Sequence, residues 1–356
     1  MVQGFVVLGY AVTALHPGIG RAPGVVDLPV QRDPMGYPMV YASSIKGAFK
    51  AECGRRLNDK DNNKNCINNK GRLDCDKCPL CCCLFGHELG GESAAGLLSV
   101  LDMVPLFFPV PSLSHGYLYI TTPYLAARAI AILETIGNND LDLQGLVAFL
   151  NTAREDGSKL KESEAIGCAG IGKEVYVGTT RLEIKRNNDK SKDSGEEKKN
   201  DSLDCSMLNV VKNLGGLAAD IANRLIVVSD KIGPLLVEKG LIRLTRIRLR
   251  VDTKTVTEQA LWTEEYIPQG TIFLSGFIAL TPRKNKYCCE ALKRDSNCIL
   301  ASKNDVGTLL KELLNILGSD NCTTYAIIGG KETIGKGILR LSLKPCKTSK
   351  SKGDKQ

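Results

Sequence analysis

The chain has 356 residues, of which 43% are hydrophobic, so it can bury the core of one large domain or of two modest ones. Its formal net charge of +8 has the sign expected for a protein that meets a polyanion. No apolar run approaches the length that crosses a bilayer, and the apolar N-terminal stretch lacks the basic region and cleavage site of a secretory signal. The composition therefore excludes a disordered or membrane-spanning chain and predicts a globular, cytoplasmic protein.

The N-terminal region predicts a strand, a long loop and a helix. Residues 5–12 read as the strand, and an irregular Gly/Pro-rich segment follows at 16–38. A loop of that length inside a compact protein is usually either functional or disordered. The helix is predicted over 43–57 because apolar side chains recur every four residues and Ser43 or Ser44 can cap its first turn.

Beyond a cysteine-rich insertion at 58–83, strands are predicted at 97–110 and 116–120. A helix over 123–136 follows, with proline in its first turn and glycine after its end. Residues 185–204 contain a single apolar residue, which is too little to order them by burial. We therefore expect a flexible loop there.

The last third of the chain continues the mixture of strands and helices. Residues 225–228 and 244–251 read as strands, and a helix over 305–317 precedes a glycine-rich segment. Strands and helices are interspersed without an internal repeat. This order favours the α+β class, built on a split βαβ, ferredoxin-like sheet.

The glycine-rich segment IIGGKETIGKGILRLSL approaches the phosphate-binding P-loop pattern. Gly337 stands where that loop needs a Ser or Thr hydroxyl, and the alternation that follows predicts a strand instead of the required helix. The pattern therefore favours a hairpin whose backbone can approach a partner closely, with Lys331 and Lys336 beside it. A plain β-turn with solvated lysines is the alternative.

Two basic features suggest contact with phosphates. Lys46 lies in the first turn of the helix over 43–57, where a cation meets the positive end of the helix dipole unless an anion is bound. A solvated surface lysine is the competing interpretation. The strand TRIRLRV places Arg246, Arg248 and Arg250 on one face, which a polyanion would stabilise, although a solvated face explains most such ladders.

Six of the fourteen cysteines fall between Cys66 and Cys83, and their CxxC spacing is typical of thiolate zinc sites. The spacing predicts structural Zn²⁺ in the insertion. The other eight cysteines are expected to be inert unless the source is a hyperthermophile, where some could pair. The predicted ligands are Cys66, Cys75, Cys78 and Cys81, with Cys82, Cys83 or His87 as alternatives for the fourth position.

Acid–base chemistry has two candidates in the long loop. His16 is the histidine that lies in this segment, and Asp27 follows it within the apolar sequence GVVDLP. A carboxylate in such surroundings is either hydrogen-bonded structurally or held for chemistry, and composition favours the structural role.

Six motifs occur in order over nearly the whole chain: HPGIGRAPGVVDLPVQRD, SSIKGAFK, LFG, GLLSVLDMVPLFFPV, LWTEEYIPQGTIF and IGGKETIGKG. Together they resemble the RAMP superfamily, and within it the backbone subunits of type III-B (Cmr) CRISPR complexes. The resemblance implies one RAMP-type domain over 1–356, with a ferredoxin-like (RRM-type) palm and a β-hairpin thumb. The insertion at 58–83, the loop at 185–204 and a disordered basic tail at 344–356 would be elaborations, and the first of these is not shared by all such subunits.

The resemblance also implies a function. Copies of the subunit would polymerise along a crRNA guide beside other Cmr subunits and cleave guide-paired, single-stranded target RNA at regular intervals. Cleavage would depend on Mg²⁺ or Mn²⁺ and proceed by attack of a 2′-hydroxyl on its own phosphate. The alternatives are a non-catalytic crRNA-binding backbone subunit and a RAMP-type endoribonuclease that processes guides.

The resemblance implies site residues motif by motif for the catalytic set, for Lys46 and for the glycine-rich segment, whereas Ser43, Ser44, Gly47, Arg246 and Arg248 are predicted from the local patterns of the helix start and the arginine strand. The catalytic residues would be Asp27, His16, Glu264 and Tyr266, with Asp27 binding the metal or taking the proton. The RNA-binding residues would be Ser43, Ser44, Lys46, Gly47, Gly329, Gly330, Lys331, Gly335, Lys336, Arg246 and Arg248.

Overall fold

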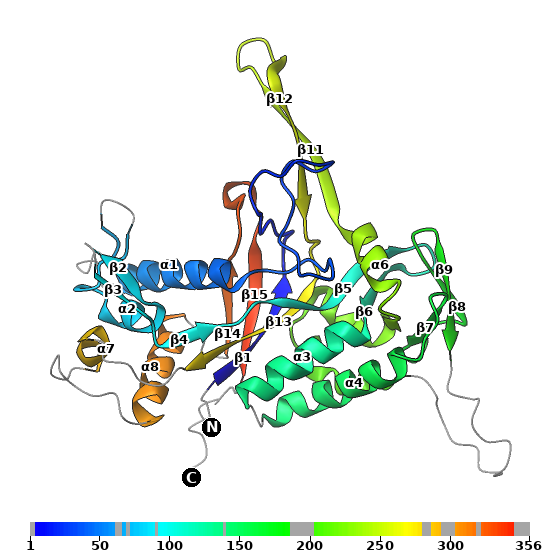
Figure 1. The fold of residues 1–356 in the computed structure, drawn as a ribbon, viewed down its shortest axis with the longest axis horizontal. Coiled ribbons are helices and arrows are strands. Elements are labelled where there is room, and N and C mark those ends of the chain that lie inside the picture. The colour runs from blue at the N-terminus through cyan, green and yellow to red at the C-terminus, as the bar shows by residue number, and fades with distance from the viewer. Residues whose placement is uncertain are drawn as a thin grey trace, which may run out of the picture.

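A large sheet with helices packed against it forms the body of the protein, and one long hairpin projects from it (Figure 1). The computed structural model describes residues 4–60, 66–68, 72–89, 92–137, 140–185, 203–279, 286–292, 303–317 and 322–344. No helix in these ranges is both long enough and apolar enough to span a membrane.

The sheet runs through the whole molecule. In spatial order its strands are β14 (Thr323–Ile327), β15 (Ile338–Lys344), β1 (Gly4–Ala11), β13 (Ile272–Ala279), β5 (Val104–Ser112), β6 (Gly116–Thr121), β10 (Leu225–Val228), β7 (Glu164–Gly167), β9 (Thr180–Lys185) and β8 (Glu174–Val177). A short strand, β4 (Leu98–Val100), also pairs with β13. Because β8 returns to pair with β5, this half of the sheet closes on itself and gives the fold a barrel-like core.

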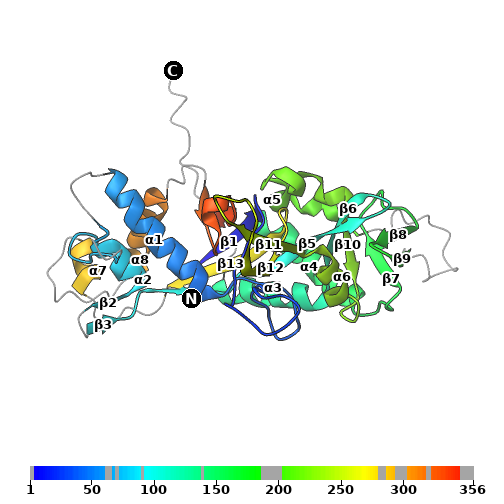
Figure 2. The ribbon, with the colours of Figure 1, turned by 90° about the horizontal axis from the view of Figure 1, so that it is seen from above.

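Helices pack against the sheet, and several of them gather at one end of the molecule (Figure 2). They are α1 (Ala42–Lys60), α2 (Pro79–Phe85), α3 (Pro123–Ile136), α4 (Leu141–Gly157), α5 (Asn209–Lys212), α6 (Gly233–Gly240), α7 (Lys286–Ala291) and α8 (Lys303–Ile316), with 3-10 turns at Cys205–Met207, Gly216–Asn223 and Glu332–Ile334. Viewed from above, α1, α2 and α7 gather at one end and β7 to β9 at the other, with the hairpin between them (Figure 2).

Local sequence signals explain α3, whose predicted bounds are confirmed. Thr122 accepts a hydrogen bond from the Leu125 backbone N–H at 3.3 Å, and Pro123 occupies the first turn, where its missing N–H costs nothing. Gly137 ends the helix in the left-handed conformation, at φ 65°. The apolar side chains of α3 are buried against the sheet and against α4.

The projecting hairpin consists of β11 (Ile242–Leu249) and β12 (Val256–Tyr266) and forms a two-stranded sheet of its own. It contains most of the strand predicted over 244–251. The predicted row of Arg246, Arg248 and Arg250 along one strand face is only partly formed. The pairing register shifts between Ile247 and Leu249, and β11 ends before Arg250. Such a ribbon is marginal alone, and its base is anchored because β12 runs through a short turn into β13.

Disulfides, and not a zinc site, hold the cysteine-rich insertion, so that prediction is corrected. Its pairs are Cys53–Cys81, Cys66–Cys78, Cys75–Cys82 and Cys83–Cys288, and a further disulfide, Cys168–Cys205, lies outside the insertion. All four predicted zinc ligands are in pairs, and a disulfide sulfur is not a thiolate donor. Within the described residues, no group of three or more His, Cys, Asp or Glu side chains could hold a metal ion. The short hairpin β2 (His87–Leu89) and β3 (Glu92–Ala94) follows the insertion.

Two predictions of disorder fall mainly outside the described residues, at 186–202 and 345–356. Their edges are ordered: Lys185 ends β9, and Lys344 ends β15. Asp204 caps the next turn by accepting a hydrogen bond from the Ser206 backbone N–H at 3.0 Å. The prediction of disorder is therefore wrong for residues 185, 203–204 and 344, and the rest of each segment lies outside the described residues.

Candidate functional site

Three segments that are far apart in the sequence meet at the base of hairpin β11–β12 (Figure 1). The loop after β1, residues 12–40, joins β12 through a hydrogen bond of 3.0 Å from the Leu28 N–H to the Thr263 carbonyl. The turn between β14 and β15 joins the same loop through a bond of 3.0 Å from the Gly330 N–H to the His16 carbonyl. This pairing gathers the predicted catalytic residues into one site.

His16 is buried in this site, with 6% of its surface exposed. Its Nδ1 lies 2.7 Å from the backbone carbonyl oxygen of Glu265. A carbonyl only accepts, so Nδ1 carries the hydrogen and, in the neutral ring, Nε2 carries the lone pair. A Cβ at position 18 would lie 2.9 Å from Nε2, so Gly18 is what keeps side-chain atoms away from this nitrogen. The ring also packs against Tyr266, with centroids 5.3 Å apart.

Asp27 is half-buried at the point where the loop meets β12. Its Oδ2 accepts a hydrogen bond of 2.8 Å from the Thr263 backbone N–H. Its backbone carbonyl accepts another from the Ala22 N–H, which closes a turn of the loop. Among the described residues no cationic side chain forms a salt bridge with Asp27, so its carboxylate keeps the capacity to bind a further group.

Glu264 is 1% exposed and lies at the centre of a cluster of donors. Trp262 Nε1 donates to Oε1 at 2.7 Å, and Arg246 Nε donates to Oε2 at 3.2 Å. The Lys331 ammonium and the Tyr266 hydroxyl also donate to the carboxylate. Each carboxylate oxygen therefore has two donors, and Glu264 holds these four side chains around one centre.

The electrostatics of this cluster fix its protonation. Burial alone would raise the pKa of Glu264, but hydrogen bonds from Lys331, Tyr266, Trp262 and Arg246 outweigh it and lower the pKa to about 2. Burial, together with the neighbouring Glu264 carboxylate, raises the pKa of the Tyr266 phenol, while Arg246 opposes the shift. At neutral pH the site thus contains an ionised glutamate and a neutral phenol.

The glycine-rich segment is a turn between two strands, as predicted, and not a P-loop. Gly329 and Gly335 have φ values of 91° and 74°, which glycine adopts readily. A Cβ at Gly329 would lie 2.7 Å from the His16 carbonyl oxygen, so only glycine fits against the loop there. The turn directs Lys331 to Glu264 and places the Lys336 ammonium 5.4 Å from the centre of the Tyr266 ring.

A second ion-pair cluster, which the sequence analysis missed, lies beside the first. Glu265 is 1% exposed, and both of its carboxylate oxygens accept from Arg32, at 2.9 and 3.0 Å. Arg243 approaches the same carboxylate at 3.2 Å, and Glu238 pairs with both arginines. Adjacent residues of a strand point to opposite faces, so the Glu264 side chain lies in the first cluster and the Glu265 side chain in the second. The consecutive glutamates of the TEEY motif were the signal that could have predicted this.

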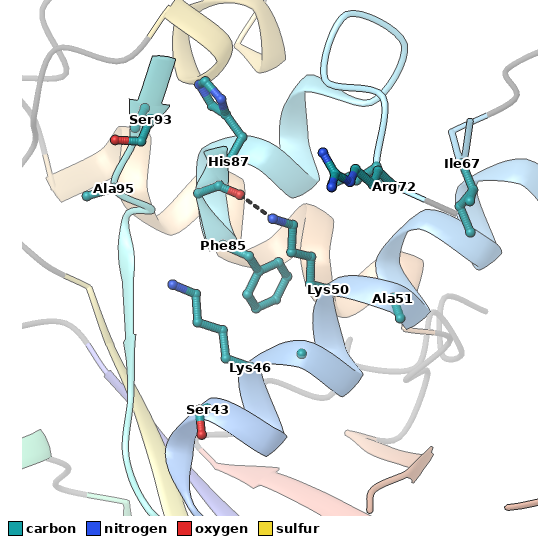
Figure 3. A pocket seen from close by; sticks show the side chains of 14 residues that line it. Ser43, Lys46, Lys50, Ala51, Ile67, Arg72, Phe85, His87, Ser93 and Ala95 are labelled. Carbon is teal, nitrogen blue, oxygen red and sulfur yellow. Dashed lines mark hydrogen bonds between the residues drawn. The ribbon is translucent and has the colours of Figure 1, made fainter. Parts of the chain in front are cut away.

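The predicted grip on helix α1 lies apart from the hairpin base, in a cavity of about 890 Å³ between α1 and the insertion (Figure 3). Ser43, Lys46 and Gly47 are among the residues that line it. Ser44 is not among its lining residues; its hydroxyl is 3.1 Å from the Gln31 amide nitrogen. Arg248 is exposed on the hairpin.

Gln31 connects the two regions. Its amide nitrogen donates to Ser44, and its amide oxygen accepts a hydrogen bond of 2.6 Å from the Tyr41 backbone N–H, just before α1. The loop that carries His16 and Asp27 is thereby fastened to the start of the helix that carries Lys46. The hairpin base and the start of α1 are therefore separate regions that are connected through the hydrogen bonds of Gln31.

Comparison with known proteins finds relatives that match nearly the whole chain. Curated relatives include the CRISPR system Cmr endoribonuclease Cmr4 of Pyrococcus furiosus, 29% identical over 340 residues and 94% of each chain. Another is the CRISPR system CMR subunit Cmr4 of Saccharolobus solfataricus, 28% identical over 338 residues and 93% of each chain.

Solved structures are similar over the same length. A cryo-EM structure of the type III-B Cmr-beta complex bound to cognate target RNA contains a chain with a TM-score of 0.64 and 25% identity, covering 96% of each chain. A crystal structure of oligomeric Cmr4 from Pyrococcus furiosus has a TM-score of 0.57 and 24% identity over 97% of this chain and 99% of that one, which supports the fold. The family model of the RAMP superfamily matches residues 10–340. The chain therefore belongs to the RAMP superfamily.

Proposed function

We propose that this protein is a backbone subunit of a type III-B CRISPR effector complex, which assembles in copies along a guide crRNA and cleaves the paired target RNA. Two curated relatives are Cmr4 subunits, one of them named an endoribonuclease, and a similar chain occurs in a complex bound to target RNA. The observation that carries the proposal is the convergence of His16, Asp27 and the Glu264 cluster at the base of the hairpin.

In this proposal the body of the protein contains the palm and the hairpin β11–β12 is the thumb. Strand β1 lies between β13 and β15, and β5 lies outside β13, with antiparallel pairing throughout. This order supports a split βαβ, ferredoxin-like palm, in which α1 and α8 would be the crossing helices. The thumb would displace one target nucleotide, which lets its 2′-hydroxyl align with the adjacent phosphate.

The proposed reaction is an in-line transesterification. The ribose 2′-hydroxyl loses its proton to a base, its oxygen bonds to the adjacent phosphorus, and the 5′-oxygen leaves with a proton. The products are a 2′,3′-cyclic phosphate and a 5′-hydroxyl. Asp27 has an available carboxylate and the Nε2 of His16 an available lone pair, so both suit proton transfer.

The cations of the site would stabilise charge on the phosphate. Lys336 lies over the Tyr266 ring, and Lys331 and Arg246 are held by Glu264. Ordered cations of this kind stabilise a phosphorane-like transition state because they need no rearrangement as charge develops. Glu264 and Tyr266 would then be positioning residues.

A divalent ion, Mg²⁺ or Mn²⁺, would be held by one carboxylate of the protein. Magnesium is often bound by one or two carboxylates together with substrate phosphate oxygens and water. Asp27 can supply such a carboxylate, whereas the Glu264 oxygens are already occupied by donors. A bound ion would neutralise charge on the phosphate.

The decisive experiment uses the assembled complex with a guide-matched target RNA. We expect Asp27→Asn to reduce cleavage at every site by at least about 100-fold without reducing guide content. Asp156→Asn, on α4 at a surface pair with Lys159, is the matched control and should cut normally. Target fragments should be evenly spaced and end in cyclic phosphates. Undiminished cleavage by Asp27→Asn would remove the catalytic assignment, and no cleavage by any complex would favour a non-catalytic backbone subunit.

A further inference from the structure

The cavity between α1 and the insertion has cations on two walls. Lys46 and Lys50 rise from α1, and Arg72 comes from the insertion opposite them (Figure 3). No carboxylate is found among the described residues that line the cavity. Like charges facing one space repel each other, and an anionic ligand between them would relieve that repulsion. The α1 residues alone thus account for only part of the site.

Neither Lys46 nor Arg72 forms an ion pair within the described part of the chain. Lys50 donates a hydrogen bond of 2.7 Å to the carbonyl of Gly86, the residue after α2, and this bond connects α1 to the end of α2. Arg72 is exposed, and its guanidinium can form two parallel hydrogen bonds to a phosphate. The cavity therefore presents donors suited to phosphate oxygens from both sides.

Gly47 supports the same conclusion from the steric side. It lies within α1, where glycine destabilises a helix relative to alanine. A Cβ there would meet no protein atom within 4 Å, so packing does not require the glycine. By contrast, a Cβ at Gly96 would lie 2.4 Å from the Leu84 carbonyl oxygen, so that glycine serves the packing of the wall. The absent side chain at Gly47 leaves room for a ligand to approach the helix backbone.

The wall that carries Arg72 is fixed covalently to the helix. Cys53 of α1 is bonded to Cys81 of α2, the Cys66–Cys78 disulfide encloses the segment with Arg72, and Cys75–Cys82 joins the end of that segment to α2. Such cross-links restrict how far the two walls can separate. The spacing of the cations across the cavity is thus set by the fold before a ligand binds.

We propose that the insertion forms a second wall of the RNA site, in which Arg72 binds a phosphodiester of the same strand that Lys46 contacts from α1. This inference rests on the proposed function, since it takes an RNA strand as the ligand. A strand passing between the walls uses cations on both sides, whereas a single phosphate would need only one side of a cavity of 890 Å³.

The test measures binding of a fluorescent single-stranded RNA to the purified full chain by anisotropy over a range of salt concentrations. We expect Arg72→Ala to weaken binding about 5- to 10-fold and to reduce the salt slope by about 0.7, the value for one phosphate contact on a single strand. Arg72→Lys should restore the slope but only part of the affinity. Lys77→Ala is the matched control, because Lys77 is an insertion cation that pairs with Asp74 outside the cavity.

The outcomes separate the two proposals. If Lys46→Ala weakens binding while Arg72→Ala leaves affinity and slope unchanged, the second wall is excluded and the proposed function stands. If Lys77→Ala acts as strongly as Arg72→Ala, the effect is one of net charge and the site assignment fails. If the wild-type chain and the assembled complex bind no RNA, both proposals fail. Arg72 is exposed, so its substitution is not expected to unfold the protein.

Discussion

Glu264 and Lys331 form an ion pair that joins strand β12 of the hairpin to the glycine-rich turn, across 67 residues of sequence. The glutamate is 1% exposed and the lysine side chain 30% exposed, so the pair closes the site at its boundary with solvent. Because Lys331 belongs to the glycine-rich turn and lowers the pKa of Glu264, the position of that turn affects the ionisation of Glu264, and the charge of Glu264 helps to hold the turn.

This pair predicts a pH dependence of stability. The folded-state pKa of Glu264 is lowered from 4.5 to about 2, so its contribution is present above the unfolded pKa and is lost as the pH falls through the folded one. We therefore expect stability to decline as the pH is lowered from about 5 to about 2. Denaturant unfolding at several pH values would measure it.

Lys331→Ala should flatten that decline, because one of the groups that lower the pKa of Glu264 is removed. Lys344→Ala is a suitable control, since Lys344 contacts Asp142 at the far end of β15. A pH dependence that is equally steep in both variants would show that Glu264 is not responsible. In the assembled complex, Lys331→Ala should also slow cleavage by about 100-fold, the cost of removing one preorganised donor.

The second cluster predicts a different cost for Arg32→Ala. The substitution removes the two-oxygen partner of the buried Glu265 carboxylate and leaves Arg243 as its remaining cation. We expect a loss of about 2 to 4 kcal/mol in the free energy of unfolding, below the full cost of orphaning a buried charge. Cleavage should fall as well, because the Glu265 backbone carbonyl orients His16.

Arg181→Ala provides the control for Arg32→Ala. Arg181 forms an exposed pair with Glu174 on the opposite half of the sheet, and such pairs contribute little to the free energy of unfolding because water screens them. Urea unfolding of the two variants, with guide RNA absent, gives the comparison. Equal losses would contradict a buried role for the Arg32–Glu265 pair.

The sequence predicted most where the signals are local. Proline after a capping threonine, and glycine after the last turn, fix the ends of α3 without reference to the rest of the chain. The Arg32–Glu265 pair could not be found in this way, because 233 residues separate its members. The approach of Asp27 and His16 to β12 depends equally on pairing between distant segments. Only the resemblance of ordered motifs suggested that these residues belong together.

The cysteines show why spacing alone misleads. A CxxC step suits both a thiolate zinc site and a compact disulfide cluster, and the difference depends on which other sulfurs are near. Cys53 looked like a core position of its helix, yet it lies opposite Cys81 with a Cα–Cα distance of 6.0 Å. Residues far along the chain, such as Cys288, complete the pattern.

This correction yields a prediction about stability. The Cys53–Cys81 bond closes a loop of 28 residues, for which the chain-entropy model gives about 3 to 4 kcal/mol. We expect Cys53→Ser with Cys81→Ser to lower the free energy of unfolding by up to this amount, measured in denaturant without reductant. Alkylation of the unfolded wild-type chain should label neither cysteine. Labelling of both, together with stoichiometric zinc by elemental analysis, would restore the metal site.

The contact between the glycine-rich turn and His16 can be tested with two glycines of the same backbone conformation. Gly329 and Gly20 both have a φ of 91°, but a Cβ at Gly329 would lie 2.7 Å from the His16 carbonyl oxygen, whereas one at Gly20 would meet nothing within 4 Å. Gly20→Ala should therefore cost about 1 to 2 kcal/mol for the left-handed conformation alone. Gly329→Ala should cost more and should displace His16, so cleavage by the assembled complex should fall with it. Equal stability and equal cleavage in the two variants would mean that the turn does not hold His16 in place.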